Sequence, residues 1–201
     1  MALKAVWFDL GETLVDESRA WGEQARRMGF HPHVVWAALG VAIERGWHHR
    51  RAYELLEADV SSLPPMTFVS SDLYADAVPC LTELRNGGYL VGIAGNQPAG
   101  LEQWLVGEAL PVDLIGSSAR WGVEKPARGF FERLVAETGC EPQEVAYVGD
   151  RVDNDVMPAA EAGLVAVHIR RGPWGYLQTG SERASLRIDS LADLPAALAG
   201  V

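Results

Sequence analysis

Short runs of apolar residues alternate with helical patterns along most of the chain. Five runs rich in β-branched, leucine and aromatic side chains have the length of buried strands, at 4–8, 89–94, 112–115, 145–148 and 164–169. Helical spacing lies between and after them, at 72–86, 99–108, 128–138, 154–162 and 191–198. Strands that alternate with helices favour right-handed crossovers. We therefore predict an α/β fold with a parallel sheet of at least five strands and helices on both faces.

One stretch, residues 17–57, interrupts this alternation, because it has helical spacing but no clear strand. Glycines and a proline divide it into three helices, and the Ser- and Pro-rich residues 61–65 lead back to the core. Its three tryptophans are expected to form a small core or a contact with the main domain. We predict an α/β core of residues 1–15 and 66–201, and an inserted helical cap of residues 16–65.

Composition narrows the class of protein. The chain has 201 residues, of which 48% are hydrophobic and 22% charged, as in soluble globular proteins. Its formal net charge of −10 disfavours nucleic acid and anionic membrane surfaces as partners. No apolar run has the length of a transmembrane helix, and residues 1–10 lack the pattern of a secretion signal, so we expect a cytoplasmic protein. Cys80 and Cys140 are expected to be free thiols.

A carboxylate stands at the end of the first apolar run, in Val6-Trp7-Phe8-Asp9-Leu10-Gly11. Ligands of open α/β sheets bind outside the carboxyl ends of the strands, which is where Asp9 is expected to lie. A carboxylate in that place can attack a phosphorus or carbon centre and form a covalent ester. We therefore predict that Asp9 is a nucleophile.

A second acidic cluster follows the fourth apolar run, in Gly149-Asp150-Arg151-Val152-Asp153-Asn154-Asp155. Asp150 and Asp155 are expected to converge with Asp9 above the sheet. Three carboxylates held together repel one another unless a cation lies among them, and hard oxygen ligands suit Mg²⁺. The pattern therefore predicts a Mg²⁺ site. For Asp153 two roles stay open, as a metal ligand or as a cap of the following helix.

Lys125, in Val123-Glu124-Lys125-Pro126, stands between the two acidic clusters along the chain. A lysine beside a carboxylate nucleophile can neutralise it and bind a transferring phosphoryl group. We therefore predict an active-site role for Lys125.

These three segments, in this order, resemble the haloacid dehalogenase superfamily of hydrolases, most of whose members are Mg²⁺-dependent phosphatases. The resemblance covers residues 1–16 and about 72–175, and the Gly-Asp-x-x-x-Asn-Asp spacing from Gly149 to Asp155 is its most specific match. It implies a Rossmann-like sheet, a helical cap in the place of the insertion, and Mg²⁺ as cofactor. It also assigns four metal ligands: Asp9, Asp150, Asp155 and the carbonyl of Gly11.

The chain departs from the family at two positions. Phosphatases of the family usually carry an Asp where this chain has Gly11, and a Ser or Thr where it has Gly95. Loss of a general acid costs about 10²- to 10⁴-fold in rate, so activity is expected to be weak unless another group replaces it. If the missing acid limits the rate, Gly11→Asp should raise it by more than about 10-fold.

Neighbours of the two glycines are candidates to replace the lost groups. Glu12 is a candidate substitute acid, although a solvated loop carboxylate is the favoured alternative. The backbone N–H groups of Gly95 and Asn96 are expected to bind an oxyanion, and Thr13 to form a hydrogen bond within the nucleophile loop.

The favoured function is hydrolysis of a small phosphate monoester through an aspartyl phosphate on Asp9. Two alternatives stay open: a dehalogenase-like attack on carbon, and a non-catalytic binding or regulatory module on a degenerate core. The partner is expected to be a small phosphorylated molecule, and the protein a monomer or homodimer. Residues 48–51 have no assigned role, and an exposed helix face is the favoured interpretation. Residues 170–175 also have no assigned role, and either a loop over the sheet edge or a subunit contact stays open.

Overall fold

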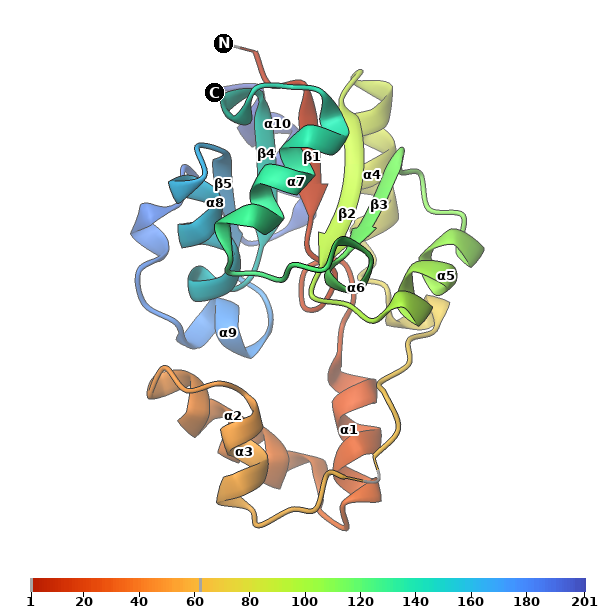
Figure 1. The fold of residues 1–201 in the computed structure, drawn as a ribbon, viewed down its shortest axis with the longest axis vertical. Helices are drawn as coiled ribbons and strands as arrows, with labels where there is room; N and C mark the ends of the chain where they lie inside the picture. The colour runs from red at the N-terminus through yellow and green to blue at the C-terminus, as the bar shows by residue number, and fades with distance from the viewer. Residues whose placement is uncertain (1, 62) are drawn as a thin grey trace.

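The computed structural model describes residues 2–61 and 63–201, and a six-stranded parallel sheet lies at its centre (Figure 1). The strand order is β3-β2-β1-β4-β5-β6. The strands are β1 Ala5–Phe8, β2 Leu90–Gly95, β3 Leu114–Ser117, β4 Val145–Gly149, β5 Val165–Ile169 and β6 Leu186–Ile188. This confirms the predicted α/β fold and its sheet of at least five strands. The sequence pattern missed β6, because a run of three residues with Arg187 at its centre is too short to show a period.

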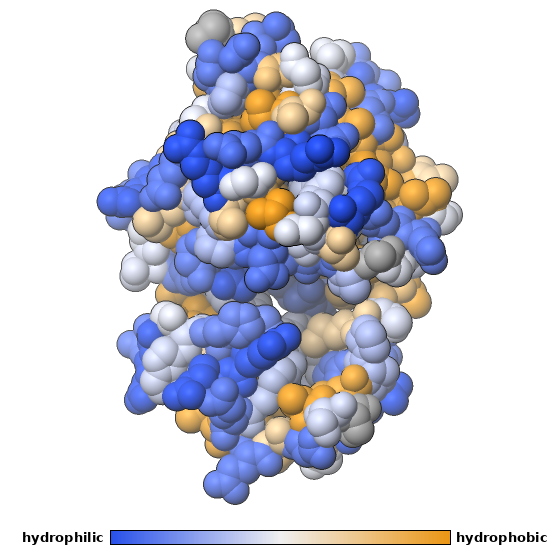
Figure 2. Space-filling view, viewed as in Figure 1, coloured by the Kyte–Doolittle hydropathy of each residue, from blue (hydrophilic) through white to orange (hydrophobic). Residues whose placement is uncertain are grey.

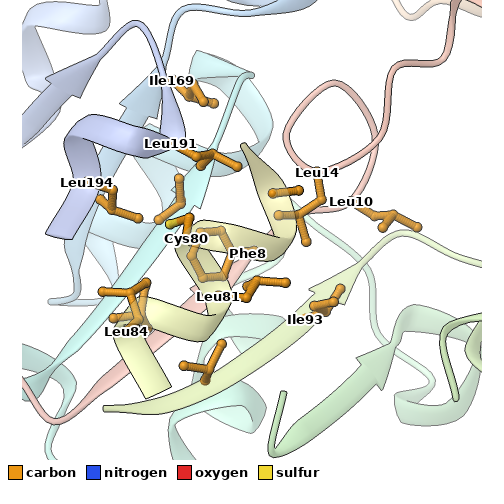
Figure 3. Close-up of a cluster of buried hydrophobic side chains, with 14 of the residues drawn as sticks. Phe8, Leu10, Leu14, Cys80, Leu81, Leu84, Ile93, Ile169, Leu191 and Leu194 are labelled. Atoms are coloured by element: carbon orange, nitrogen blue, oxygen red, sulfur yellow. The ribbon is translucent and has the colours of Figure 1, made fainter. Parts of the chain in front are cut away.

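The two faces of the sheet are separated by the alternation of side chains along each strand. On β1, Val6 and Phe8 point into one apolar cluster, whereas Ala5 and Trp7 point into another. Figure 3 shows the first cluster, in which Phe8 and Ile93 of the sheet pack against Leu81 and Leu84 of a helix. Both faces are therefore buried, as expected of a parallel sheet.

The helices of the core are α4 Ala77–Asn86, α5 Ala99–Gly107, α6 Ser118–Trp121, α7 Arg128–Thr138, α8 Met157–Glu161, α9 Gly172–Leu177 and α10 Leu194–Leu198. Most of them cover the two faces of the sheet, and α9 packs against the inserted helix α2. Helices α4, α5 and α10 pack on the cluster of Phe8, and α7 and α8 on the cluster of Trp7.

Three helix predictions need correction at their first residue. Helix α10 begins at Leu194 rather than Leu191, because Leu191–Asp193 form a 3₁₀ turn before it. Helix α4 begins at Ala77 rather than Asp72, because Ser70–Asp72 form a separate 3₁₀ turn that ends at Leu73, whose backbone is extended with ψ of 132°. Helix α8 begins at Met157, because residues Val152–Val156 form a π-helical turn before it.

Three helices fall inside the predicted cap: α1 Ser18–Arg27, α2 Pro32–Glu44 and α3 Arg50–Leu55. We refer to them as the three-helix segment. Figure 1 shows this segment at the end of the molecule toward which β1 and β2 point, with both termini at the opposite end. Its apolar cluster includes Trp21 and, partly buried, Trp36 and Trp47, as predicted. None of the helices in the described ranges is long and apolar enough to cross a membrane.

Helix α9 joins the three-helix segment to the core. The sequence predicts no role for residues 170–175; from Gly172 onward they belong to this helix. Trp174 of α9 is 5% exposed and belongs to the apolar cluster of the three-helix segment. The core therefore contributes a tryptophan to the packing of the inserted helices.

Candidate active site

The carboxyl ends of the central strands bring the predicted catalytic groups together. Asp9 directly follows β1, and Asp150 directly follows the neighbouring strand β4. Lys125 lies in the connection from α6 to α7, and Asp155 in the π-helical turn after β4. Four residues from three separate segments of the chain thus share one edge of the sheet, as the sequence predicts.

Lys125 is the centre of this group. Its Nζ atom donates to Asp9 Oδ1 at 2.7 Å and to Asp155 Oδ1 at 2.6 Å, and lies 3.0 Å from the hydroxyl of Tyr147. That hydroxyl in turn donates to the carbonyl of Ala94 at 2.8 Å. Burial lowers the pKa of Lys125, but the charges of Asp155 and Asp9 outweigh it and raise the pKa well above its ordinary value. The lysine therefore stays charged beside the nucleophile.

The Asn96 side chain fixes the backbone of Lys125. Its Oδ1 accepts from the Lys125 N–H at 2.7 Å, and its Nδ2 donates to the Lys125 carbonyl at 2.8 Å. Asn96, predicted to bind substrate through its backbone, thus uses its side chain to position the lysine.

Three carboxylates gather around the lysine. Oxygen atoms of Asp9, Asp150 and Asp155 all lie within 4.8 Å of one another. Burial, followed by the charges of Asp155 and Asp9, raises the pKa of Asp150 well above its ordinary value. One lysine balances only one of the three negative charges, so the cluster has the charge and the hard oxygen donors that suit Mg²⁺.

The two acids after β4 differ in how their oxygens are engaged. Asp150 Oδ2 is buried and has no hydrogen-bond partner among the described residues, so it is available to a cation. Asp155 Oδ1 accepts from Lys125, and its Oδ2 accepts from the N–H of Arg151 at 3.0 Å. Asp153 pairs with the guanidinium of Arg151 at 2.8 Å.

The space beside Gly11 is filled by another side chain. A Cβ atom on Gly11 would lie 2.4 Å from Oε1 and 2.9 Å from Cδ of Glu17. Burial, followed by the charge of Glu12, raises the pKa of Glu17 to about 7. Gly11→Asp alone is therefore not expected to raise the rate as the sequence suggests, because the new carboxylate and that of Glu17 would occupy the same space.

Glu12 is buried rather than solvated, and the favoured expectation of a solvated loop carboxylate is wrong. Its side chain turns inward from a backbone with φ of 52°, in the left-handed region. Its Oε2 accepts from the hydroxyl of Tyr74 at 2.7 Å, and its Oε1 from the N–H of Glu17 at 3.3 Å. Burial raises the pKa of Glu12 to about 6, although the hydrogen bond from Tyr74 lowers it.

Gly95 lies against the nucleophile. A Cβ atom there would lie 2.5 Å from Asp9 Oδ1 and 3.0 Å from Nε2 of Gln97. Thr13, the third predicted substrate-binding residue, is fully buried, and its hydroxyl has no partner among the described residues. Its N–H donates to the carbonyl of Leu10 at 3.3 Å, within the nucleophile loop.

A cavity of about 590 Å³ lies over these groups, between the core and the three-helix segment. Figure 2 shows the surface hollowed between these two parts. From the core, the cavity is lined by Asp9, Gly11, Glu12, Lys125, Asp150 and Arg151, among others. The three-helix segment and its loops contribute Trp21, Trp47, His48, His49 and Tyr53. A volume of this size suits a small molecule.

Two of the four residues at 48–51 reach this cavity. His48 and His49 line it, whereas Arg51 lies at the surface and pairs with Glu54 at 2.5 Å. Burial, followed by the charge of His48, lowers the pKa of His49 to about 4, so this ring is neutral at pH 7.

Several residues of the site were missed by sequence reasoning. Tyr147 reads as one more buried strand residue, and Gln97 as part of a loop. Glu17 lies at the start of the first helix of the insertion, where an acidic residue ordinarily serves to stabilise the helix N-terminus. The only sequence signal for Glu17 is that it follows Asp9 by eight residues. This distance along the chain does not predict the turn that brings Glu17 back beside Gly11.

Comparison with known proteins identifies the family of this chain. The profile of the haloacid dehalogenase-like hydrolases matches residues 3–163. The chain therefore belongs to this hydrolase family, as the resemblance of its three motifs implied, and the non-catalytic alternative loses its support.

Two curated relatives and one solved structure are similar to most of the chain. A glyceraldehyde 3-phosphate phosphatase of Methanopyrus kandleri is 30% identical, over 86% of each chain. A phosphoserine phosphatase of Thermus thermophilus is 29% identical, over 85% of this chain and 65% of that protein. The crystal structure of a HAD phosphatase from Thermococcus onnurineus has a TM-score of 0.64 and 24% identity, covering 98% of this chain and 99% of the other.

Proposed function

We propose that this protein is a phosphatase that hydrolyses a small alkyl phosphate monoester through a phosphorylated Asp9. The observation that carries the proposal is the Lys125 ammonium held between Asp9 and Asp155, beside the unpartnered oxygen of Asp150 and under a cavity of about 590 Å³. The names of the two curated relatives support it, since each is a phosphatase of a small phosphate ester.

Asp9 is the nucleophile in this proposal. Lys125 holds Oδ1 of the carboxylate, so we assign the attack on phosphorus to Oδ2. Lys125 also offers its positive charge to the phosphoryl oxygens as negative charge develops on them. Tyr147 and Asn96 keep the lysine in place, one at its side chain and the other at its backbone.

The acidic cluster fits Mg²⁺, which would screen Asp9 from the negative charge of the substrate. Asp150 would hold it through Oδ2, which has no partner among the described residues, together with the Asp9 carboxylate and the carbonyl of Gly11. Asp155 is less available, because both of its oxygens are already bound, one by Lys125 and one by Arg151. Asp155 then serves to hold Lys125 and to complete the charge balance of the site.

A panel of alkyl phosphates, assayed with and without Mg²⁺, tests this proposal. The wild-type protein should release phosphate with Mg²⁺ and lose that activity with a chelator. Asp9→Asn should lower the rate by roughly 10³- to 10⁶-fold, the range seen when a nucleophile is removed. Asp150→Asn should raise the Mg²⁺ concentration needed for half-maximal activity.

Asp189→Asn is the matched control, because Asp189 is exposed and its one ion pair with the described residues is with the exposed Arg170, 2.7 Å away. Such surface pairs contribute little, so this variant should keep wild-type activity. Unchanged phosphate release by a correctly folded Asp9→Asn would contradict the proposed mechanism.

A further inference from the structure

Glu17 reaches the place that the glycine at position 11 leaves open. Its Oε1 lies where a side chain on Gly11 would begin, 2.4 Å from the position of a Cβ atom there. Gly11 lies two residues after Asp9, and both Glu17 and Asp9 line the same cavity. A carboxyl group therefore lies next to the nucleophile, although it comes from a different position in the chain.

The first helix of the three-helix segment holds this carboxyl group. Trp21, one turn into α1, donates from Nε1 to Glu17 Oε2 at 3.0 Å. Its ring lies 4% exposed in the apolar cluster of the segment, so the donor is fixed by packing. One oxygen of Glu17 is thus anchored, and the other is the oxygen beside Gly11.

Glu12 is less suited to proton transfer at this place. Each of its oxygens accepts a hydrogen bond, one from the Tyr74 hydroxyl and one from the Glu17 N–H. These bonds tie Glu12 to the Tyr74 side chain and to the backbone just before α1. Glu17 keeps one oxygen directed at the space next to the nucleophile.

We propose that Glu17 is the general acid and base of this active site, a role that rests on the proposed phosphatase function. In the first step the Asp9–phosphorus bond forms, the bond from phosphorus to the leaving oxygen breaks, and the proton of the Glu17 carboxyl group passes to that oxygen. In the second step Glu17 takes a proton from the water that attacks phosphorus, which releases phosphate and the Asp9 carboxylate. Because Glu17 immediately precedes α1, the three-helix segment supplies the acid as well as part of the cavity wall.

The dependence on the leaving group tests this role. An alkoxide needs a proton as it leaves, whereas a nitrophenolate does not. Glu17→Gln should therefore lower kcat/KM on an alkyl phosphate by about 10²- to 10⁴-fold, the range of general acid catalysis, and by less than about 10-fold on nitrophenyl phosphate. On nitrophenyl phosphate it should also release a burst of nitrophenolate equal to the enzyme concentration, because the second step is slowed.

Two further variants keep the result interpretable. Glu44→Gln removes an exposed carboxylate of α2 and should behave as wild type on both substrates. Gly11→Asp combined with Glu17→Ala moves the carboxyl group to position 11, and should recover at least about 10-fold of the alkyl phosphatase activity that Glu17→Ala alone loses. Thermal unfolding of each variant checks that it is folded.

The outcomes separate this inference from the function on which it rests. If Glu17→Gln keeps the wild-type rate on alkyl phosphates while Asp9→Asn is inactive, the role of Glu17 is refuted and the phosphatase stands. An equal loss on both substrates without a burst also refutes it, because a merely structural role would act that way. If the wild-type protein hydrolyses none of these phosphates, both proposals fail.

Discussion

The backbone of Gly95 lies so close to the nucleophile Asp9 that a larger residue would not fit there. Its missing Cβ would lie 2.5 Å from Asp9 Oδ1, the oxygen that Lys125 holds. The hydroxyl that the family usually carries here therefore has no room while Asp9 keeps this position. Nε2 of Gln97 lies 3.0 Å from the position of a Cβ atom on Gly95, so after Asp9 it is the next polar side-chain group that a larger residue would meet there.

A serine at position 95 is accordingly expected to harm this enzyme. Gly95→Ser should push Asp9 away from Lys125 and lower kcat by at least about 10-fold, since displacing reacting groups by about 1 Å can cost 10²-fold. Gly100→Ser in α5 is the matched control, because a Cβ atom at Gly100 meets nothing within 4 Å. Steady-state kinetics of the two variants checks this, and a gain of activity in Gly95→Ser would show that Asp9 has another productive position.

The sequence predicts those site residues that directly follow a strand, because the ends of neighbouring parallel strands lie together. Asp9 and Asp150 end adjacent strands, so their meeting is predictable from an α/β pattern alone. Glu17 was not predictable in this way. The carbonyl of Leu10 accepts the N–H groups of Leu14 and Val15, both at 2.9 Å, and this tight turn returns the chain toward Gly11.

At the scale of elements, α9 decides how the three-helix segment is attached to the core. No sequence pattern predicts this helix, because its six residues include Gly172 and Pro173, which are typical of a loop. Trp174 makes it an anchor: its side chain belongs to the apolar cluster of the three-helix segment, α9 packs against α2, and the Arg151 guanidinium lies 5.0 Å from the centre of the ring. One tryptophan thus connects the cavity wall, the core and the inserted helices.

Removing that ring should loosen the three-helix segment while the sheet stays folded. Truncation of a buried tryptophan costs about 3–5 kcal/mol, and here the loss falls on the contact between the two parts. Trp174→Ala should therefore speed amide hydrogen exchange in α2 and α3, leave β1 and β4 protected, and raise KM.

Tyr176→Ala provides the control from the same helix, because Tyr176 is 65% exposed. It should leave exchange in α2 and α3 as in the wild-type protein. Equal exchange in the two variants would show that Trp174 does not anchor the segment.

At the scale of the whole molecule, the core and the three-helix segment enclose the cavity over Asp9, and both supply groups to it. The core brings Asp9, Lys125 and the metal-binding acids, and the inserted helices bring Trp21, His49 and the anchored Glu17. The sequence predicts an inserted helical part, because residues 17–57 interrupt the alternation of strands and helices. It could not predict which side chains cross from one part to the other, since that depends on how the two parts meet.

The most direct measurement of the central claim is the mass of the Asp9 peptide during turnover. Wild-type protein mixed with Mg²⁺ and an alkyl phosphate, and quenched with acid within one turnover, should carry one phosphoryl group on Asp9. Asp9→Asn, treated in the same way, should carry none. Release of phosphate by the wild-type protein with an unmodified Asp9 at every quench time, or an alkyl ester on Asp9 in place of a phosphoryl group, would contradict the account.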